Sequence, residues 1–148
     1  MDKKIAENKK AYFDYEILDK FEAGIVLFGY EVKSVRQGNI KLKSAFVTFH
    51  KNEPYLTGAH IGKYKPAGKL PSFDPERSRK LLMKKKEIRF LLGKSQEKGL
   101  TIVPLLVYTK GSKIKIEIGV GRGKKRYEKK EIKKKRDIER EVRRTLKY

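Results

Sequence analysis

Few residues of this chain could support catalysis or bind a metal. Its 148 residues include no cysteine, which excludes disulfides, thiolate metal ligands and a cysteine nucleophile. The two histidines, His50 and His60, fall in stretches that we expect to form strands, and they do not form an H-x-x-x-H pair. We therefore predict no catalytic residue and no metal site, and we expect that the protein is not an enzyme.

A segment rich in glycine and lysine, Gly119–Lys125, has some features of a phosphate-binding loop. It lacks the four-residue gap between glycines, and it lacks the Ser or Thr after lysine that magnesium binding needs. It also follows the last expected strand and leads into a basic tail. We interpret it as a flexible joint whose backbone N–H groups can contact RNA phosphates.

The net charge points to a polyanionic partner. The chain has 39 Lys and Arg against 18 Asp and Glu, which gives a formal net charge of +21. Such an excess indicates a nucleic acid or an anionic membrane. No apolar run approaches the roughly 18 residues of a membrane span, and the start of the chain has no apolar signal segment. We therefore expect a cytoplasmic protein with no membrane partner.

Positive charge is densest at the C-terminal end. Residues 123–148 hold 13 Lys and Arg against 5 Asp and Glu and have too few apolar residues for a core. Ile138, Val142 and Leu146 nevertheless recur every four residues, as on one face of a helix. We predict a folded RNA-binding domain over residues 1–122 and a tail over 123–148 that is disordered when free and helical when bound. The alternative is a solvated tail that adds only nonspecific affinity.

The hydropathy pattern of residues 1–122 predicts a mainly β domain. About six short strands are expected, at residues 13–17, 24–28, 46–50 and 55–60 and in a closing hairpin that turns at 110–112. A short helix is expected at 30–37, ended by Gly38, and a longer one that begins at Asp74-Pro75 and is divided at 84–86. This combination predicts a small closed antiparallel barrel of the oligonucleotide-binding (OB) type, with about three helices outside it.

Two glutamates, Glu22 and Glu31, are unusual choices in so basic a chain because each lies between glycines and aromatic residues. A carboxylate accepts hydrogen bonds from base or ribose donors, which phosphates do not offer. The alternative is that each glutamate pairs with a neighbouring Lys or Arg. Tyr127 lies among basic tail residues with no core nearby, so its ring is free to stack on an unpaired base.

Several segments, in order along nearly the whole chain, resemble the signature of the SsrA-binding proteins. They are Asn8–Ala11, Phe21–Leu27, Gly29–Arg36, Asp74–Pro75, Arg77–Leu82, Gly99–Leu105, Gly119–Val120 and Gly123–Lys125. The resemblance implies an OB-type barrel that binds the tRNA-like portion of transfer-messenger RNA. It implies delivery of that RNA to bacterial ribosomes stalled on messages without a stop codon, where the nascent peptide is tagged. It implies no cofactor and no small-molecule substrate.

The resemblance also implies a set of body residues that bind RNA. Glu22, Leu82 and Lys84 match family positions tied to RNA binding, although many members have Asn where Lys84 stands. The expected RNA-binding residues are Asn8, Lys9, Glu22, Gly24, Glu31, Lys33, Arg36, Lys80, Leu82 and Lys84.

A second set of residues, in the tail, matches the family segment tied to tagging. Tyr127 falls where other members carry His or Tyr, at a position linked with the decoding centre of the small ribosomal subunit. The expected ribosome-contacting residues are Gly123, Lys124, Lys125, Tyr127, Glu128, Lys129 and Lys130. The alternative function is that of a generic basic rRNA-binding or ribosome-associated protein with an OB-like barrel.

The charge analysis predicts a steep salt dependence of RNA binding. If Lys and Arg side chains neutralise several phosphates, the logarithm of the affinity falls linearly with the logarithm of salt concentration, by roughly 0.7–0.9 per phosphate. Filter binding or fluorescence anisotropy at four or more salt concentrations measures this slope. A flat response would contradict the electrostatic part of the prediction.

Overall fold

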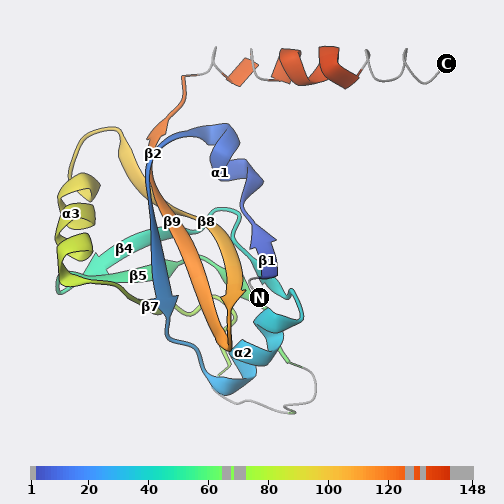
Figure 1. Cartoon of the computed structure of the whole chain (residues 1–148), viewed down its shortest axis with the longest axis vertical. Helices are drawn as coiled ribbons and strands as arrows, with labels where there is room; N and C mark the ends of the chain where they lie inside the picture. The colour runs from blue at the N-terminus through green and yellow to red at the C-terminus, as the bar shows by residue number, and fades with distance from the viewer. Residues whose placement is uncertain (1–2, 65–67, 69–72, 126–128, 131–132, 141–148) are drawn as a thin grey trace.

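The computed structural model describes residues 3–64, 68, 73–125, 129–130 and 133–140. In these residues the fold is mainly β, with helices beside the sheet (Figure 1). The strands are β1 (Lys3–Glu7), β2 (Tyr15–Ile25), β3 (Ile40–Lys41), β4 (Phe46–His50), β5 (Glu53–Thr57), β6 (His60–Ile61), β7 (Arg79–Leu82), β8 (Leu100–Lys110) and β9 (Lys113–Gly123). The helices are α1 (Lys9–Asp14), α2 (Gly29–Arg36) and α3 (Lys85–Ser95), and residues 133–140 are helical as well.

One antiparallel sheet contains seven of these strands, in the order β1-β8-β9-β2-β7-β5-β4, while β3 pairs with β6. The β8–β9 hairpin lies between β1 and β2 and turns at Gly111, as the sequence predicted. Ile116 and Ile118 on β9 are buried in the core. Since side chains alternate along a strand, Lys115 and Glu117 belong to the opposite face.

The predicted mainly β, antiparallel fold with helices is confirmed, but the closed barrel is not. Among the described residues, the hydrogen-bonded sheet ends at two edge strands, β1 and β4. β4 does pack against β8, so the sheet curves back on itself without a closing ladder of hydrogen bonds. More strands than the expected six are present. β1 and β7 lie in segments that were not expected to be strands, and β3 and β6 have two residues each, too few to show an alternating pattern.

The expected strands at 13–17 and 24–28 are wrong in their bounds. Phe13 belongs to α1, and a single strand, β2, runs from Tyr15 to Ile25. Asn8 begins α1 because its side-chain oxygen accepts the Ala11 N–H at 3.2 Å. The polar residues in the middle of β2 belong to a strand with one exposed face, so they do not interrupt it.

The helix expected from Asp74-Pro75 is also wrong. Asp74 accepts the Glu76 N–H at 2.9 Å in a turn, and the chain then enters strand β7 between β2 and β5. Leu81 is 1% exposed and Leu82 is 54% exposed, which is the alternation of a strand and not a helical stripe. The helix starts only at Lys85, where the side chain of Glu87 accepts the Lys84 N–H. The predicted helix at 30–37 is confirmed as α2, and Gly38 follows it at a φ of +82°.

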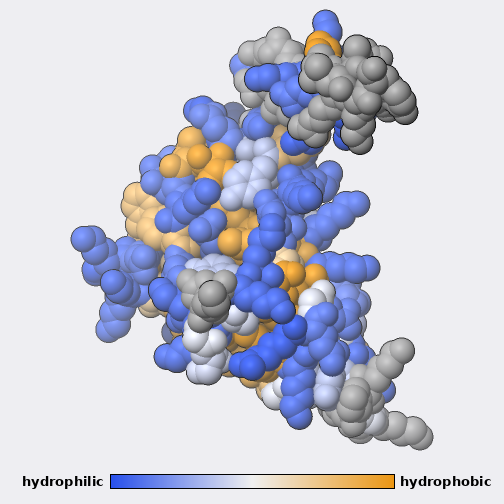
Figure 2. Space-filling model, turned by 45° about the vertical axis from the view of Figure 1, so that its right-hand side comes forward, coloured by the Kyte–Doolittle hydropathy of each residue, from blue (hydrophilic) through white to orange (hydrophobic). Residues whose placement is uncertain are grey.

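Polar and charged side chains cover most of the face seen in Figure 2, with hydrophobic side chains showing between them. The core beneath contains mostly aliphatic residues from the sheet, together with Val35 of α2 and Leu91 of α3. In the tail, Ile138 is 55% exposed, so the helical residues 133–140 do not bury the apolar position that falls within them. The other two residues of the four-residue apolar repeat, Val142 and Leu146, lie outside the described residues.

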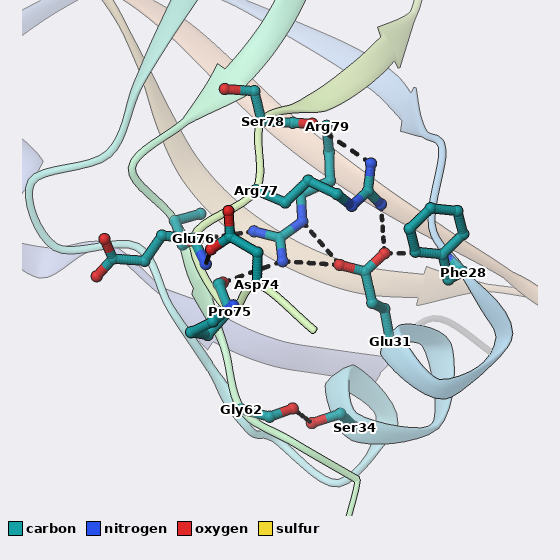
Figure 3. Close-up of polar contacts among 11 residues, drawn as sticks. Phe28, Glu31, Ser34, Gly62, Asp74, Pro75, Glu76, Arg77, Ser78 and Arg79 are labelled. Atoms are coloured by element: carbon teal, nitrogen blue, oxygen red, sulfur yellow. Dashed lines mark hydrogen bonds and ion pairs between the residues drawn. The ribbon is translucent and has the colours of Figure 1, made fainter. Parts of the chain in front are cut away.

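A buried ion pair joins α2 to β7 (Figure 3). Glu31 and Arg79 are each 1% exposed, and Arg79 donates to Glu31 Oε2 from Nε at 3.0 Å and from Nη2 at 2.7 Å. Arg77 donates to the other oxygen, Oε1, which also accepts the Phe28 N–H at 2.8 Å. Arg79 further donates to the carbonyls of Ala59 and Pro75 at 2.7 and 3.0 Å. Four parts of the chain therefore meet at one carboxylate and one guanidinium group.

This pair predicts a large and pH-dependent contribution to stability. Burial raises the pKa of Glu31, but hydrogen bonds from Phe28, Arg77 and Arg79 outweigh it and hold the pKa below the ordinary 4.5. The stabilisation is therefore present at neutral pH and is lost as the pH falls through the lowered pKa of the folded state. Glu31→Gln leaves Arg79 buried without a counter-charge and should cost about 3–5 kcal/mol in urea unfolding at pH 7.

A matched control separates burial from simple loss of a charge. Glu53→Gln removes an exposed ion pair to Lys80, with a distance of 3.0 Å, and should cost less than about 1 kcal/mol. Equal effects of the two substitutions would contradict the assignment of Glu31 as a structural centre. The same would follow if acidification below pH 4.5 destabilised wild type and Glu31→Gln equally.

Candidate nucleic-acid interface

The exposed face of strands β2, β9 and β8 carries a lysine-rich surface. The strand register places Glu22 opposite Glu117, Gly24 opposite Lys115, and Lys115 opposite Tyr108. Because these positions share one face of the sheet, their side chains lie together above it. We call this set the lysine face; its residues are Lys20, Glu22, Tyr108, Lys110, Lys113, Lys115 and Glu117.

Glu22 lies within the lysine face as a held but accessible acceptor. Its carboxylate accepts the Tyr108 hydroxyl and, at 3.3 Å, the Lys110 ammonium group. The hydrogen bond from Tyr108, followed by the one from Lys110, holds the pKa of Glu22 below its ordinary value. The side chain is 40% exposed, so its unused lone pairs can still meet an outside donor. Glu22 thus has the neighbours of a counter-charge together with the exposure of a binding group.

Gly24 and Leu82 lie side by side next to Glu22. They are register partners between β2 and β7, and a Cβ at Gly24 would come within 3.3 Å of the Leu82 Cβ. With Lys113 and Lys115 they line a hollow of about 360 Å³ on the surface. Leu82 is more than half exposed there. Lys84, two residues further along, is exposed just before α3.

Helix α2 and strand β7 position the other predicted cations of the body. Arg36 donates to the Ser112 carbonyl at 2.8 Å, which ties α2 to the β8–β9 turn. The ammonium group of exposed Lys33 lies 5.5 Å from the centre of the Tyr64 ring. The hydrogen bond and charge of Glu53 raise the pKa of Lys80, so Lys80 stays cationic. Of these three cations, Arg36 contacts the edge of the hollow, because Ser112 is one of the residues that line it.

Two predicted RNA-binding residues lie inside the protein. Asn8 is 6% exposed, and its amide group donates to the carbonyls of Leu42 and Pro104 at 3.3 and 2.9 Å. Glu31 is occupied by the buried pair described above. These placements favour structural roles for both residues over direct contact with RNA. Lys9 is exposed, but on α1, at the end of the molecule opposite α2 (Figure 1).

The start of the tail lies against the C-terminal end of α1. The Lys124 N–H donates to the Asp14 carbonyl at 2.9 Å, and Lys129 forms an ion pair with the Asp14 carboxylate at 3.2 Å. Gly123 ends β9, while Lys125 and Lys130 are exposed. Tyr127 and Glu128 lie outside the described residues.

Sequence reasoning missed Tyr108, Lys110 and Lys115 as parts of the interface. Tyr108 lies 86 residues from Glu22, and only the β2–β9–β8 order brings them together. The alternation of lysine and isoleucine along β9 was the signal that could have placed Lys113 and Lys115 on the exposed face. Among the described residues there is no group of three or more possible metal ligands, and no helix there is long and apolar enough to cross a membrane.

Comparisons with known proteins give one consistent result. The family model described as "SmpB protein" matches residues 5–148. The SsrA-binding protein of Sulfurihydrogenibium sp. (strain YO3AOP1) is 53% identical over 146 residues, covering 99% of this chain and 95% of that protein. The SsrA-binding protein of Persephonella marina is 51% identical over 140 residues, covering 95% and 91%.

A solved structure gives the same result at the level of the fold. A chain of "tmRNA-SmpB: a journey to the center of the bacterial ribosome" is 46% identical, with a TM-score of 0.68, and the match covers 82% of this chain and 85% of that one. Sequence and fold therefore agree over most of the molecule, and the chain belongs to the SmpB family of SsrA-binding proteins.

Proposed function

We propose that this protein binds the tRNA-like portion of transfer-messenger RNA (SsrA) and delivers it to stalled bacterial ribosomes, where the nascent peptide is tagged in trans-translation. The supporting observation is an exposed carboxylate, Glu22, held by Tyr108 and Lys110 within the lysine face. Lysines attract any phosphate backbone, whereas a fixed carboxylate selects base or ribose donors. The family assignment supplies the identity of that RNA.

The body and the tail have different tasks in this proposal. Transfer-messenger RNA is bound in the body by Glu22, Gly24, Leu82 and the cations around the hollow. The strands and helices that carry these residues are held in place by Asn8 and Glu31. The tail contacts rRNA of the small-subunit decoding region through its basic residues, with Tyr127 as the stacking group. Its helix is completed on that surface, which is consistent with the exposure of Ile138.

Three further features belong to the proposal. The protein acts by binding and not as an enzyme, with no cofactor. Its curved sheet is of the OB type, supported by the packing of β4 on β8. A ribosomal partner places the protein in the cytoplasm. A competition assay distinguishes this function from the alternative, a generic rRNA-binding protein. Unlabelled transfer-messenger RNA should displace labelled transfer-messenger RNA from the protein far better than bulk tRNA or rRNA does.

Replacement of Glu22 tests the assignment of the lysine face. As a base or ribose acceptor, Glu22 should matter despite its negative charge, so Glu22→Ala should weaken binding to transfer-messenger RNA by about 1–3 kcal/mol. Glu117→Ala is the matched control because it removes the same charge from the same face, where Glu117 lies 4.0 Å from Lys20. If both variants bind equally tightly, or both bind more tightly than wild type, Glu22 is only a counter-charge. Thermal melts verify that each variant folds.

Removal of residues 126–148 tests the separate role of the tail. The sheet should stay folded because β9 ends at Gly123, and RNA affinity should fall only modestly because the lysine face is intact. Peptide tagging on stalled ribosomes should be lost because the ribosomal contact is missing. Tyr127→Ala should impair tagging more than RNA affinity, since a base stack is worth about 1–3 kcal/mol. Tagging at the full rate by the truncated protein would favour the nonspecific-tail alternative.

A further inference from the structure

The C-terminal end of α1 holds the start of the tail through backbone and side-chain contacts. Beyond the bond from the Lys124 N–H to the Asp14 carbonyl, the Lys124 ammonium group donates to the Tyr12 carbonyl at 2.9 Å. Carbonyl groups at the end of a helix lack partners within the helix, and a lysine side chain is a suitable donor to them. Lys124 is thereby fixed at two points on α1.

Five residues further along, the tail is held again by the same aspartate. Lys129 Nζ lies 3.2 Å from Asp14 Oδ1, while Asp14 Oδ2 faces Lys10 at 3.4 Å. The Lys129 N–H also donates to the Lys125 carbonyl at 3.2 Å. Asp14 thus contacts the tail through both its carbonyl and its carboxylate.

The remaining described part of the tail has fewer constraints. Residues 133–140 are exposed, and their one aromatic contact with the body is Arg136, 5.7 Å from the centre of the Phe13 ring on α1. Among the described residues, these contacts between the body and the tail beyond β9 are therefore all made by α1. A single exposed ion pair is weak, but several contacts to one short helix together restrict the direction of the tail more than any one of them does alone.

We infer that Asp14 is a positioning residue that fixes the direction in which the basic tail leaves the folded domain. Without its carboxylate the tail would lose the anchor at Lys129 and keep only the bonds of Lys124 to the α1 carbonyls, so the tail beyond Lys124 would reach the ribosomal surface from more orientations. The apparent affinity of a contact falls with the fraction of molecules in the competent orientation. This inference rests on the proposed role of the tail for its effect on tagging, but not for its effect on tail geometry.

A distance measurement tests the inference directly on the full chain. Because the chain has no cysteine, spin labels can be attached at Lys98→Cys in the body and Lys134→Cys in the tail without other changes. Asp14→Asn should broaden the distribution of label-to-label distances. Lys10→Gln is the matched control: it removes the other ion pair of Asp14 and leaves the tail contacts, so the distribution should stay as narrow as in the wild type. Asp14→Glu should restore most of the narrow distribution.

The functional arm measures tagging and RNA affinity in the same variants. If Asp14→Asn lowers the docked fraction to about a third, the tagging rate should fall about threefold, with affinity for transfer-messenger RNA and the melting temperature unchanged. A charge exchange, Asp14→Lys with Lys129→Asp, should narrow the distance distribution again. The inference is overturned if Asp14→Asn leaves the distribution as narrow as the wild type. If the distribution broadens while tagging is unaffected, Asp14 positions the tail but the proposed role of the tail fails.

Discussion

The buried pair of Glu31 and Arg79 is the constraint on which the arrangement of the interface depends. Burial of an ion pair costs desolvation energy, and here that cost is offset because the guanidinium group and the carboxylate have their hydrogen bonds satisfied together. The pair fixes α2 against β7 and holds β7 as a strand between β2 and β5. Only in that position does Leu82 lie beside Gly24, next to the proposed RNA acceptor Glu22.

The same chemistry, a glutamate among cations, serves two different ends in this molecule. At Glu31 the carboxylate is fully enclosed, so its partners fix the fold. At Glu22 the hydrogen-bond partners are Tyr108 and Lys110 on β8, and the carboxylate side chain is 40% exposed. A carboxylate that is already oriented loses little conformational entropy when it accepts a bond from RNA. In the proposed interface, Tyr108 and Lys110 would therefore orient Glu22 for binding without removing its charge.

What the sequence predicted depended on whether the signal was local. The β8–β9 hairpin and α2 were predicted because their periodicity and turns lie within about ten residues of each other. Strand β7 was predicted as a helix because its cause, the contact of Arg79 with Glu31, spans 48 residues and leaves no local pattern. Glu22 was found as a candidate from its unusual charge, but its partner Tyr108 follows from strand order, which residue spacing does not give.

The sheet also determines how the two proposed binding regions relate. β2 and β9 run side by side through the body, and the tail leaves from the end of β9 near α1 (Figure 1). The hollow beside Gly24 is lined in part by Val32 of α2. Both strands have eleven residues, so at about 3.3 Å per residue they separate the two regions by roughly 30 Å. A hydrogen-bonded pair of that length resists bending, so RNA bound at the proposed site would have a fixed position relative to the root of the tail. Residual freedom then lies at the joint after Gly123, where the contacts of Asp14 limit it.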